Sequence, residues 1–240
     1  MRTALVVHAH PDDEVFATGA ATIALSDAGW RVVLRVATGG EASEDPALGE
    51  VEARRVRTEK LSRSCELLGI AEWGWLGDWV DRGGAGAGTV ANEESAVLVD
   101  AVRRALGEVR PELVLTVGSD GLTGHPDHVA IGAAVREAAD DVLGARLRAA
   151  DVVAAHKSLK EYAGGRPVGS GRVLGVGNET VLEEIRGTAE DRRRQALDVY
   201  RAGLGTLPLD QVLGGRLGDS VLLRAVLDVA GWDRDLFERS

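Results

Sequence analysis

Two short apolar runs, each followed closely by a histidine-proline-aspartate motif, set the strongest limits on how this chain folds. Ala4–Val7 leads into the first motif, His10–Glu14, and Leu113–Val117 precedes the second, His125–His128. Apolar, β-branched runs of this length indicate buried strands. Proline suits the first turn of a helix, where its missing N–H is not needed. Each motif is therefore predicted to lie between a strand and a helix, at the carboxyl end of a sheet.

The first motif crowds a histidine and two adjacent carboxylates together. His10, Asp12 and Asp13 are too close to be buried without a partner cation, because neighbouring carboxylates repel each other and each loses solvation. His10 and Asp13 are three residues apart, as are His125 and His128, so each pair is expected on one side of a first helical turn. A divalent metal ion would resolve the repulsion.

The two motifs together resemble the signatures of the LmbE-like, or PIG-L, family of metal-dependent de-N-acetylases, which read A-H-P-D-D-E and G-H-P-D-H. Both are complete here, at Ala9–Glu14 and Gly124–His128. The resemblance is strong over roughly the first 140 residues and weak beyond them. It implies a Rossmann-like α/β fold of the LmbE type, with a mostly parallel sheet flanked by helices and the site at the carboxyl ends of the strands.

The resemblance also implies a ligand set. Matched position by position, His10, Asp13 and His128 are the metal ligands. Three nitrogen and oxygen ligands with one open, water-occupied position make the catalytic zinc arrangement. The same donors accept ferrous iron.

Roles for three further motif residues follow from the same resemblance. Asp12 is the candidate general base, which takes a proton from the metal-activated water. His125 is expected to stabilise the oxyanion or to protonate the tetrahedral intermediate, and Asp127 to hydrogen-bond His125 and hold it charged. An isolated aspartate at a helix start is normally an N-cap, so these roles depend on the joint pattern.

Substrate contacts are expected from three residues outside or beside the motifs. Arg57 belongs to an arginine-x-glutamate pattern that is common in the family's equivalent helix, although a solvated helix face explains it equally well. Asp81 competes with Asp78 for the aspartate that faces the substrate in relatives. Thr123 occupies the position where relatives that act on glucosaminyl-inositol have a tyrosine, so the specificity is expected to differ.

The length of 240 residues suits a single α/β domain over residues 1–240. The net charge of −10 argues against nucleic acid or an anionic membrane as the main partner. The single cysteine excludes an internal disulfide. No apolar run is long enough to span a membrane, and the first strand leaves no room for a signal peptide. A cytoplasmic protein is therefore expected, and a homo-oligomer is compatible with the sequence.

The other elements are predicted from apolar periodicity and from glycine and proline breaks. Strands are predicted at Val32–Ala37 and Val173–Val176, and the family resemblance implies a short strand that ends at Leu76-Gly77. Helices are predicted at Val15–Ala28, Glu50–Gly69, Val97–Val109, from the second motif to Leu143, and at Ala145–Tyr162, Thr180–Tyr200 and Val221–Val229. Arg82–Gly88 is predicted to be a flexible loop and a candidate lid. Tyr200 stands where relatives often have a histidine, which leaves the carboxy-terminal part of the pocket undefined.

The leading functional hypothesis is a metal-dependent hydrolase that removes an N-acetyl group from an N-acetylated amino sugar or sugar conjugate. One alternative is an amidase for a larger amide, such as a thiol conjugate. Another is an inactive metal-binding module, but binding alone requires neither Asp12 nor His125. A nucleotide-binding Rossmann protein is disfavoured because the phosphate-binding glycine motif is absent.

Overall fold

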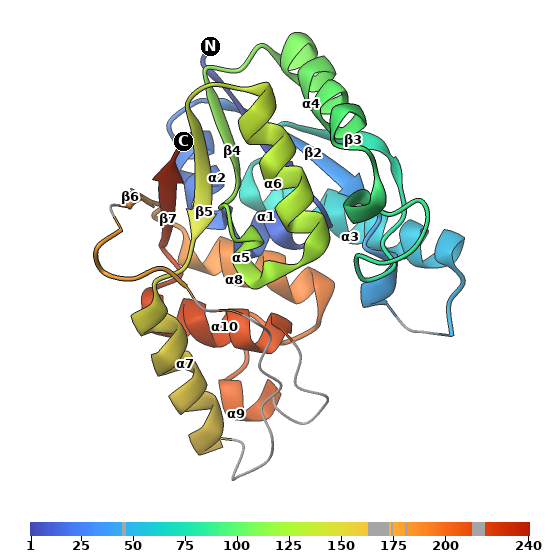
Figure 1. Ribbon diagram of the computed structural model, residues 1–240. Helices are drawn as coiled ribbons and strands as arrows, with labels where there is room; N and C mark the ends of the chain where they lie inside the picture. Colours follow the sequence, from blue (N-terminus) through green and yellow to red (C-terminus); the bar gives the residue numbers. More distant parts are fainter. Residues whose placement is uncertain (45–46, 163–172, 174, 181, 213–218) are drawn as a thin grey trace.

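A single seven-stranded sheet organises the computed structural model, which describes residues 1–44, 47–162, 173, 175–180, 182–212 and 219–240 (Figure 1). The strand order is β3-β2-β1-β4-β5-β7-β6. The first five of these are parallel neighbours, whereas β7 runs antiparallel to both β5 and β6. The predicted mostly parallel α/β sheet is confirmed. The strands are β1 Thr3–His8, β2 Arg31–Thr38, β3 Glu72–Trp79, β4 Leu113–Val117, β5 Val142–Arg146, β6 Glu183–Arg186 and β7 Arg234–Arg239.

Helices pack on both faces of the sheet (Figure 1). Alternate residues of β1 enter two separate cores, with Ala4 and Val6 in one and Leu5 and Val7 in the other. A strand covered on both faces reads as a continuous apolar run, which explains why β1 was recognisable. The helices and 3-10 turns are α1 Asp13–Phe16, α2 Gly19–Asp27, η1 Glu41–Ser43, α3 Glu50–Leu68, η2 Val90–Asn92, α4 Ser95–Val109, α5 Gly121–Gly124, α6 Pro126–Ala138, α7 Ala149–Tyr162, α8 Glu190–Tyr200, α9 Leu209–Val212 and α10 Asp219–Ala230.

Most elements up to α6 lie where the sequence predicted them. The strand β2 and the helices α3 and α4 match their predicted ranges to within two residues, and α10 matches the final predicted helix. The strand β3 contains Leu76-Gly77, where the resemblance implied a strand end, and continues to Trp79. The helix predicted from Val15 to Ala28 is divided at Ala17 and Thr18 into α1 and α2. Among the described residues, no helix is long and apolar enough to cross a membrane.

The prediction of a helix from the second motif to Leu143 was wrong. The helix α6 ends at Ala138, and the chain turns at Asp141, whose φ is +59°, before it enters β5. Residues 142–145 of β5 are all buried. A short apolar run of this kind does not distinguish a buried strand from a buried helix by periodicity. The helix predicted from Ala145 accordingly begins only at Ala149, as α7.

The prediction of one helix over Thr180–Tyr200 was also wrong, because β6 occupies its first part. Gly187 separates β6 from α8, and a Cβ atom there would lie 2.7 Å from the carbonyl oxygen of Ala20. β7 was not predicted at all, since its ends are charged. The strand predicted at Val173–Val176 falls partly outside the described residues, and Val176 forms an isolated parallel bridge with Arg148.

Candidate metal centre

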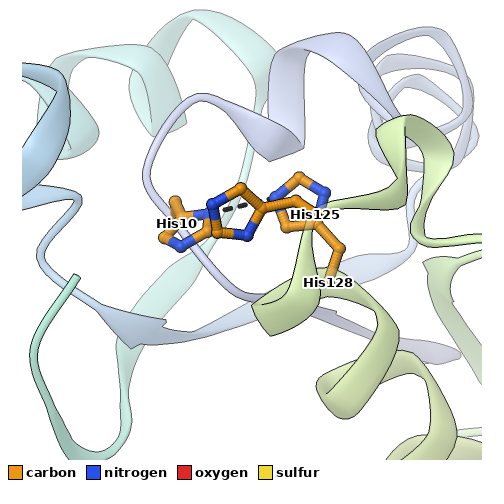
Figure 2. Close-up of side chains that lie close together, drawn as sticks. All are labelled: His10, His125 and His128. Atoms are coloured by element: carbon orange, nitrogen blue, oxygen red, sulfur yellow. Dashed lines mark hydrogen bonds between the residues drawn. The ribbon is translucent and has the colours of Figure 1, made fainter. Parts of the chain in front are cut away.

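The two histidine motifs meet because their strands are neighbours in the sheet. β1 pairs in parallel with β4, and carboxyl ends of parallel neighbours lie at the same edge. The chain leaving β1 carries His10 into α1, and the chain leaving β4 carries His125 and His128 into α6. Figure 2 shows these three imidazole rings side by side at that edge.

The helix α6 begins at the second motif, as predicted from its proline. Pro126 occupies the first turn, and His125 is the N-cap. The Nδ1 atom of His125 accepts a hydrogen bond of 3.2 Å from the backbone N–H of Asp127. In the neutral ring the proton therefore resides on Nε2, so His125 presents a donor to the pocket.

One nitrogen of His10 and one of His128 converge on the carboxylate of Asp13. The His10 Nδ1 atom lies 3.0 Å from His128 Nε2, and Asp13 lies 3.2 Å from His128 Nε2 and 3.8 Å from His10 Nδ1. All three side chains are buried. These are the three residues that the family resemblance implied as ligands.

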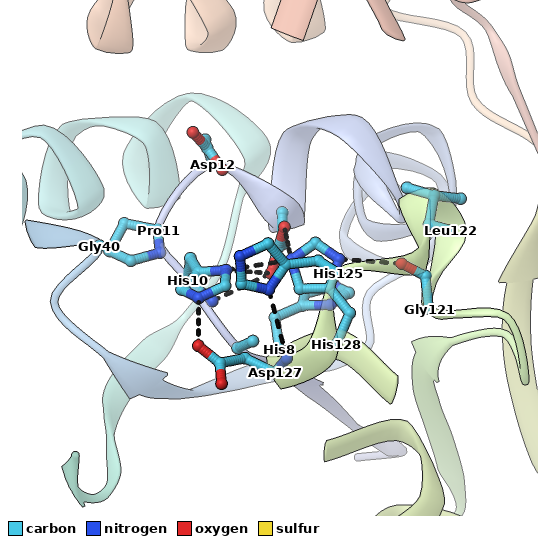
Figure 3. A network of polar contacts seen from close by, with 12 residues as sticks. His8, His10, Pro11, Asp12, Gly40, Gly121, Leu122, His125, Asp127 and His128 are labelled. Carbon is cyan, nitrogen blue, oxygen red and sulfur yellow. Dashed lines mark hydrogen bonds and ion pairs between the residues drawn. The ribbon is translucent and has the colours of Figure 1, made fainter. Parts of the chain in front are cut away.

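The remaining nitrogen of each ring has an acceptor of its own (Figure 3). His10 Nε2 lies 3.2 Å from the Asp127 carboxylate, and His128 Nδ1 lies 2.9 Å from the carbonyl oxygen of Gly121. Both nitrogens of each ring have an acceptor within reach, and a metal ion beside Asp13 requires the tautomer in which the protons lie toward Asp127 and Gly121. The two nitrogens that face each other beside Asp13 are then both lone pairs, an arrangement that a cation stabilises. The residues therefore fit a metal ion.

The pKa shifts of His10 and Asp13 also favour a positive charge at this site. Burial alone would lower the pKa of His10, but the hydrogen bond to Asp127 and the charges of Asp13 and Asp81 raise it to about 9. Burial alone would raise the pKa of Asp13, but His128 and His10 hold it well below its usual range. The surroundings of His10 thus favour a positive charge, which a metal ion also supplies.

Among the described residues, two overlapping groups of side chains have potential ligand atoms within 4.8 Å of one another. One contains His10, His125 and His128, and the other contains His10, Asp81, His125 and Asp127. His125 is less suited as a ligand, because the proton on its Nε2 atom would have to leave. The carboxylate of Asp81 lies 3.8 Å from His10 Nε2.

Asp127 is placed differently from the expectation. Its carboxylate contacts His10 and accepts a 2.7 Å hydrogen bond from the backbone N–H of Ala91, while its backbone N–H contacts His125. Burial, followed by the charges of His10 and His128, lowers the pKa of His125. The Asp127 carboxylate therefore hydrogen-bonds His10 rather than His125, and its negative charge only partly offsets the lowering of the His125 pKa.

Asp12 stands at the side of the site rather than among the ligands. Its carboxylate accepts a 3.1 Å hydrogen bond from Arg57, and in Figure 3 it is directed away from the imidazole rings. Burial raises the pKa of Asp12, against the charge of Arg57. A raised pKa brings a carboxylate closer to the range suited to a general base.

The histidines open into a pocket of about 470 Å³. Asp81 and Thr123, two of the three expected substrate contacts, line it. Arg57 does not: its side chain is only 3% exposed and lies behind Asp12. A larger groove of about 580 Å³ between α3 and α8 contains none of the motif residues.

Sequence reasoning missed Phe16 of α1 and the residues that α10 contributes to the pocket wall. Phe16 and Leu223 supply apolar surface, and Asp219 and Ser220 supply polar groups. Phe16 follows the first motif closely and was within reach of a sequence argument. The three α10 residues carry no local signal, since only the fold brings that helix to the carboxyl edge of β1.

Comparison with known proteins identifies the first part of the chain. Residues 5–139 match the family model PIG-L, described as GlcNAc-PI de-N-acetylase. A curated relative from Kineococcus radiotolerans, 1D-myo-inositol 2-acetamido-2-deoxy-alpha-D-glucopyranoside deacetylase, is 34% identical over 153 residues, which are 54% of this chain and 42% of the relative. The chain thus spans less than half the length of that protein.

Solved structures share the fold over nearly the whole chain. The zinc-inhibited form of a teicoplanin deacetylase matches with a TM-score of 0.63 at 16% identity, covering 99% of this chain and 98% of the other. A 4-carboxy-2-hydroxymuconate hydratase from Pseudomonas putida matches with a TM-score of 0.61 at 15% identity, covering 100% and 96%. Because these two proteins have different activities, the likeness at such identities shows the fold alone.

Proposed function

Because this chain belongs to the PIG-L family of de-N-acetylases, we propose that it removes the acetyl group from an N-acetylglucosamine conjugate by metal-dependent hydrolysis. The observation that carries the proposal is the convergence of His10 Nδ1, His128 Nε2 and the Asp13 carboxylate at a pocket. The name of the curated relative makes N-acetylglucosaminyl inositol the first substrate to test.

We propose His10, Asp13 and His128 as the residues that hold the metal ion. A bound zinc or ferrous ion supplies Lewis acidity, which polarises the amide carbonyl and makes an attacking water more acidic. Asp127 and the Gly121 carbonyl fix the ring orientations, as acceptors behind metal-binding histidines generally do. The ligand set does not by itself select zinc over iron.

Two residues beside the ligands are proposed to handle the protons. Asp12 takes a proton from the attacking water, which requires its carboxylate to turn from Arg57 toward the pocket, and passes that proton to the sugar nitrogen as the C–N bond breaks. His125, with its proton on Nε2, donates a hydrogen bond to the oxygen on which negative charge develops. A donor of this kind typically contributes about 10²-fold or more to turnover.

The decisive test measures acetate release from a panel of N-acetylglucosamine conjugates, with the inositol conjugate included. The protein is stripped of metal and then reconstituted with zinc or, without oxygen, with ferrous iron. We expect release only after reconstitution. If metal binds and no acetate appears, a second panel with larger acyl groups distinguishes an amidase for larger amides from an inactive binding module.

Variants separate the proposed roles of the motif residues. His128→Ala is expected to lose metal, whereas His125→Ala should retain metal and lose about 10²-fold or more in turnover. Asp12→Ala should retain metal and lose about 10²- to 10⁴-fold. Metal content is measured by elemental analysis and turnover by acetate release. Full activity in Asp12→Ala with metal bound would refute the general-base role.

A further inference from the structure

A fully buried carboxylate, Glu14, lies directly behind the proposed base. Its Oε1 atom accepts hydrogen bonds of 2.6 Å from the Ser64 hydroxyl and 2.7 Å from the Tyr200 hydroxyl. Its Oε2 atom accepts a 2.9 Å hydrogen bond from the backbone N–H of Asp12. Glu14 therefore links the helices α3 and α8 to the backbone of the first motif.

The backbone that Glu14 holds is strained. Asp12 has a φ of +100°, in the left-handed region that side chains disfavour. Such a conformation costs on the order of 1–3 kcal/mol and persists only where the surroundings determine it. Two neighbours do so here: Glu14 accepts the Asp12 N–H, while Arg57 donates to the Asp12 carboxylate and to the carbonyl of Pro11.

Tyr200 contacts both of these supports. Its hydroxyl donates to Glu14, and its ring lies under the guanidinium of Arg57, with 4.9 Å between Arg57 Cζ and the ring centroid. The side chain is buried, at 8% exposure. It comes from the last turn of α8, well beyond the residues that match the family model.

We propose that Tyr200 is a positioning residue for the proposed reaction. By holding Glu14 and Arg57 together it sets the backbone and the carboxylate of Asp12 relative to the metal ligands. The kinetic consequence rests on the proposed function, because it requires Asp12 to act as the base. The structural consequence, a rigid first motif, does not depend on activity.

The test compares two substitutions at Tyr200 that remove its contacts in steps. Tyr200→Phe removes only the hydroxyl that reaches Glu14, and Tyr200→Leu also removes the ring under Arg57. Ser64→Ala is the matched control for the first step, because it removes the other donor to the same Glu14 oxygen. Leu197→Ala, a buried truncation in the same helix, is the control for loss of stability alone.

We expect Tyr200→Phe and Ser64→Ala to lower kcat by similar factors, up to about tenfold, and Tyr200→Leu to lower it by roughly a hundredfold, as small misplacements of reacting groups do. KM and zinc content should stay at their wild-type values. Amide hydrogen exchange across Ala9–Phe16 should accelerate in Tyr200→Leu. Leu197→Ala should lower the melting temperature while kcat and this exchange stay unchanged.

Two results would overturn the proposal. One is a zinc-loaded Tyr200→Leu protein with wild-type kcat and wild-type exchange across Ala9–Phe16. The other is a fall in kcat in Tyr200→Leu that is no larger than the fall in kcat in Leu197→Ala. If the wild-type protein releases no acetate from any substrate, the proposed function fails, and the exchange comparison alone still decides whether Tyr200 holds the first motif.

Discussion

At the scale of single residues, the two nitrogens of His10 have different partners. Nδ1 faces His128 and Asp13, whereas Nε2 faces the carboxylates of Asp127 and Asp81. A carboxylate that accepts the ring proton leaves the opposite nitrogen free to bind a metal. Asp127 therefore favours Nδ1 as the His10 nitrogen that would bind the proposed metal ion.

Substitution of Asp127 by asparagine tests this role. The new amide oxygen is expected to keep the hydrogen bond from Ala91, so its NH₂ group would face His10 Nε2 and draw the ring proton to Nδ1. We expect zinc affinity to fall by about 10- to 100-fold, as measured by competition with a chromophoric chelator. Asp78→Asn, at a side chain that is 99% exposed, is the control. Wild-type affinity in Asp127→Asn would contradict the assignment.

At the scale of elements, α8 ties the start of the chain to its end through a fully buried arginine. Arg193 donates to the carbonyls of Val15 and Phe16 behind the first motif and to that of Trp232. It also forms a 2.7 Å ion pair with Asp235 of β7, which is itself buried. One side chain thereby holds α1, α8 and β7 together.

Replacing Arg193 by methionine should keep most of the volume and leave the charge of Asp235 buried without its partner. We expect the free energy of unfolding to fall by about 3–5 kcal/mol, as for other broken buried pairs, in urea titrations. Arg192→Met, which removes a partly exposed ion pair with Asp27 and a hydrogen bond to the carbonyl of Leu67, should cost clearly less, about 1–2 kcal/mol. Equal losses of unfolding free energy in both variants would show that the buried Arg193–Asp235 ion pair stabilises the fold no more than the Arg192–Asp27 pair does.

At the scale of the whole molecule, the pocket is assembled from segments far apart in the sequence. The chain after β1, the chain after β4 and the start of α10 all contribute to its wall. A metal ion held by His10, Asp13 and His128, as proposed, would therefore link α1 to α6 across the edge of the sheet.

Metal binding is accordingly expected to stabilise the fold as a whole. At a free zinc concentration of 100 times the dissociation constant, the gain is about 2.7 kcal/mol, or roughly 5–10 °C in melting temperature for a domain of this size. Calorimetry of metal-free and zinc-saturated protein measures the shift. His128→Ala should show none, and an equal shift in that variant would place the stabilising zinc elsewhere.

Elements with local signals could be predicted from the order of the residues alone. The apolar run of β1 has a continuous pattern because both of its faces are buried, and Pro126 marked the start of α6. The two motifs also identified the family and indicated where its implied ligands would converge. Such features depend on residues within a turn or a strand of one another, and a linear pattern records them directly.

Contacts between residues far apart in the chain became visible in the folded structure and could not be predicted from local patterns. The strand β7 was missed because its ends are charged and its apolar pattern is weak. Its pairing with β5 on one side and β6 on the other compensates for that weak pattern. The spacing of the second motif could not show that the Asp127 carboxylate faces His10 rather than His125. Nor could it bring Tyr200 to Glu14. These contacts arise from packing across the sheet, where hydrogen-bond partners are chosen by proximity in space rather than along the chain.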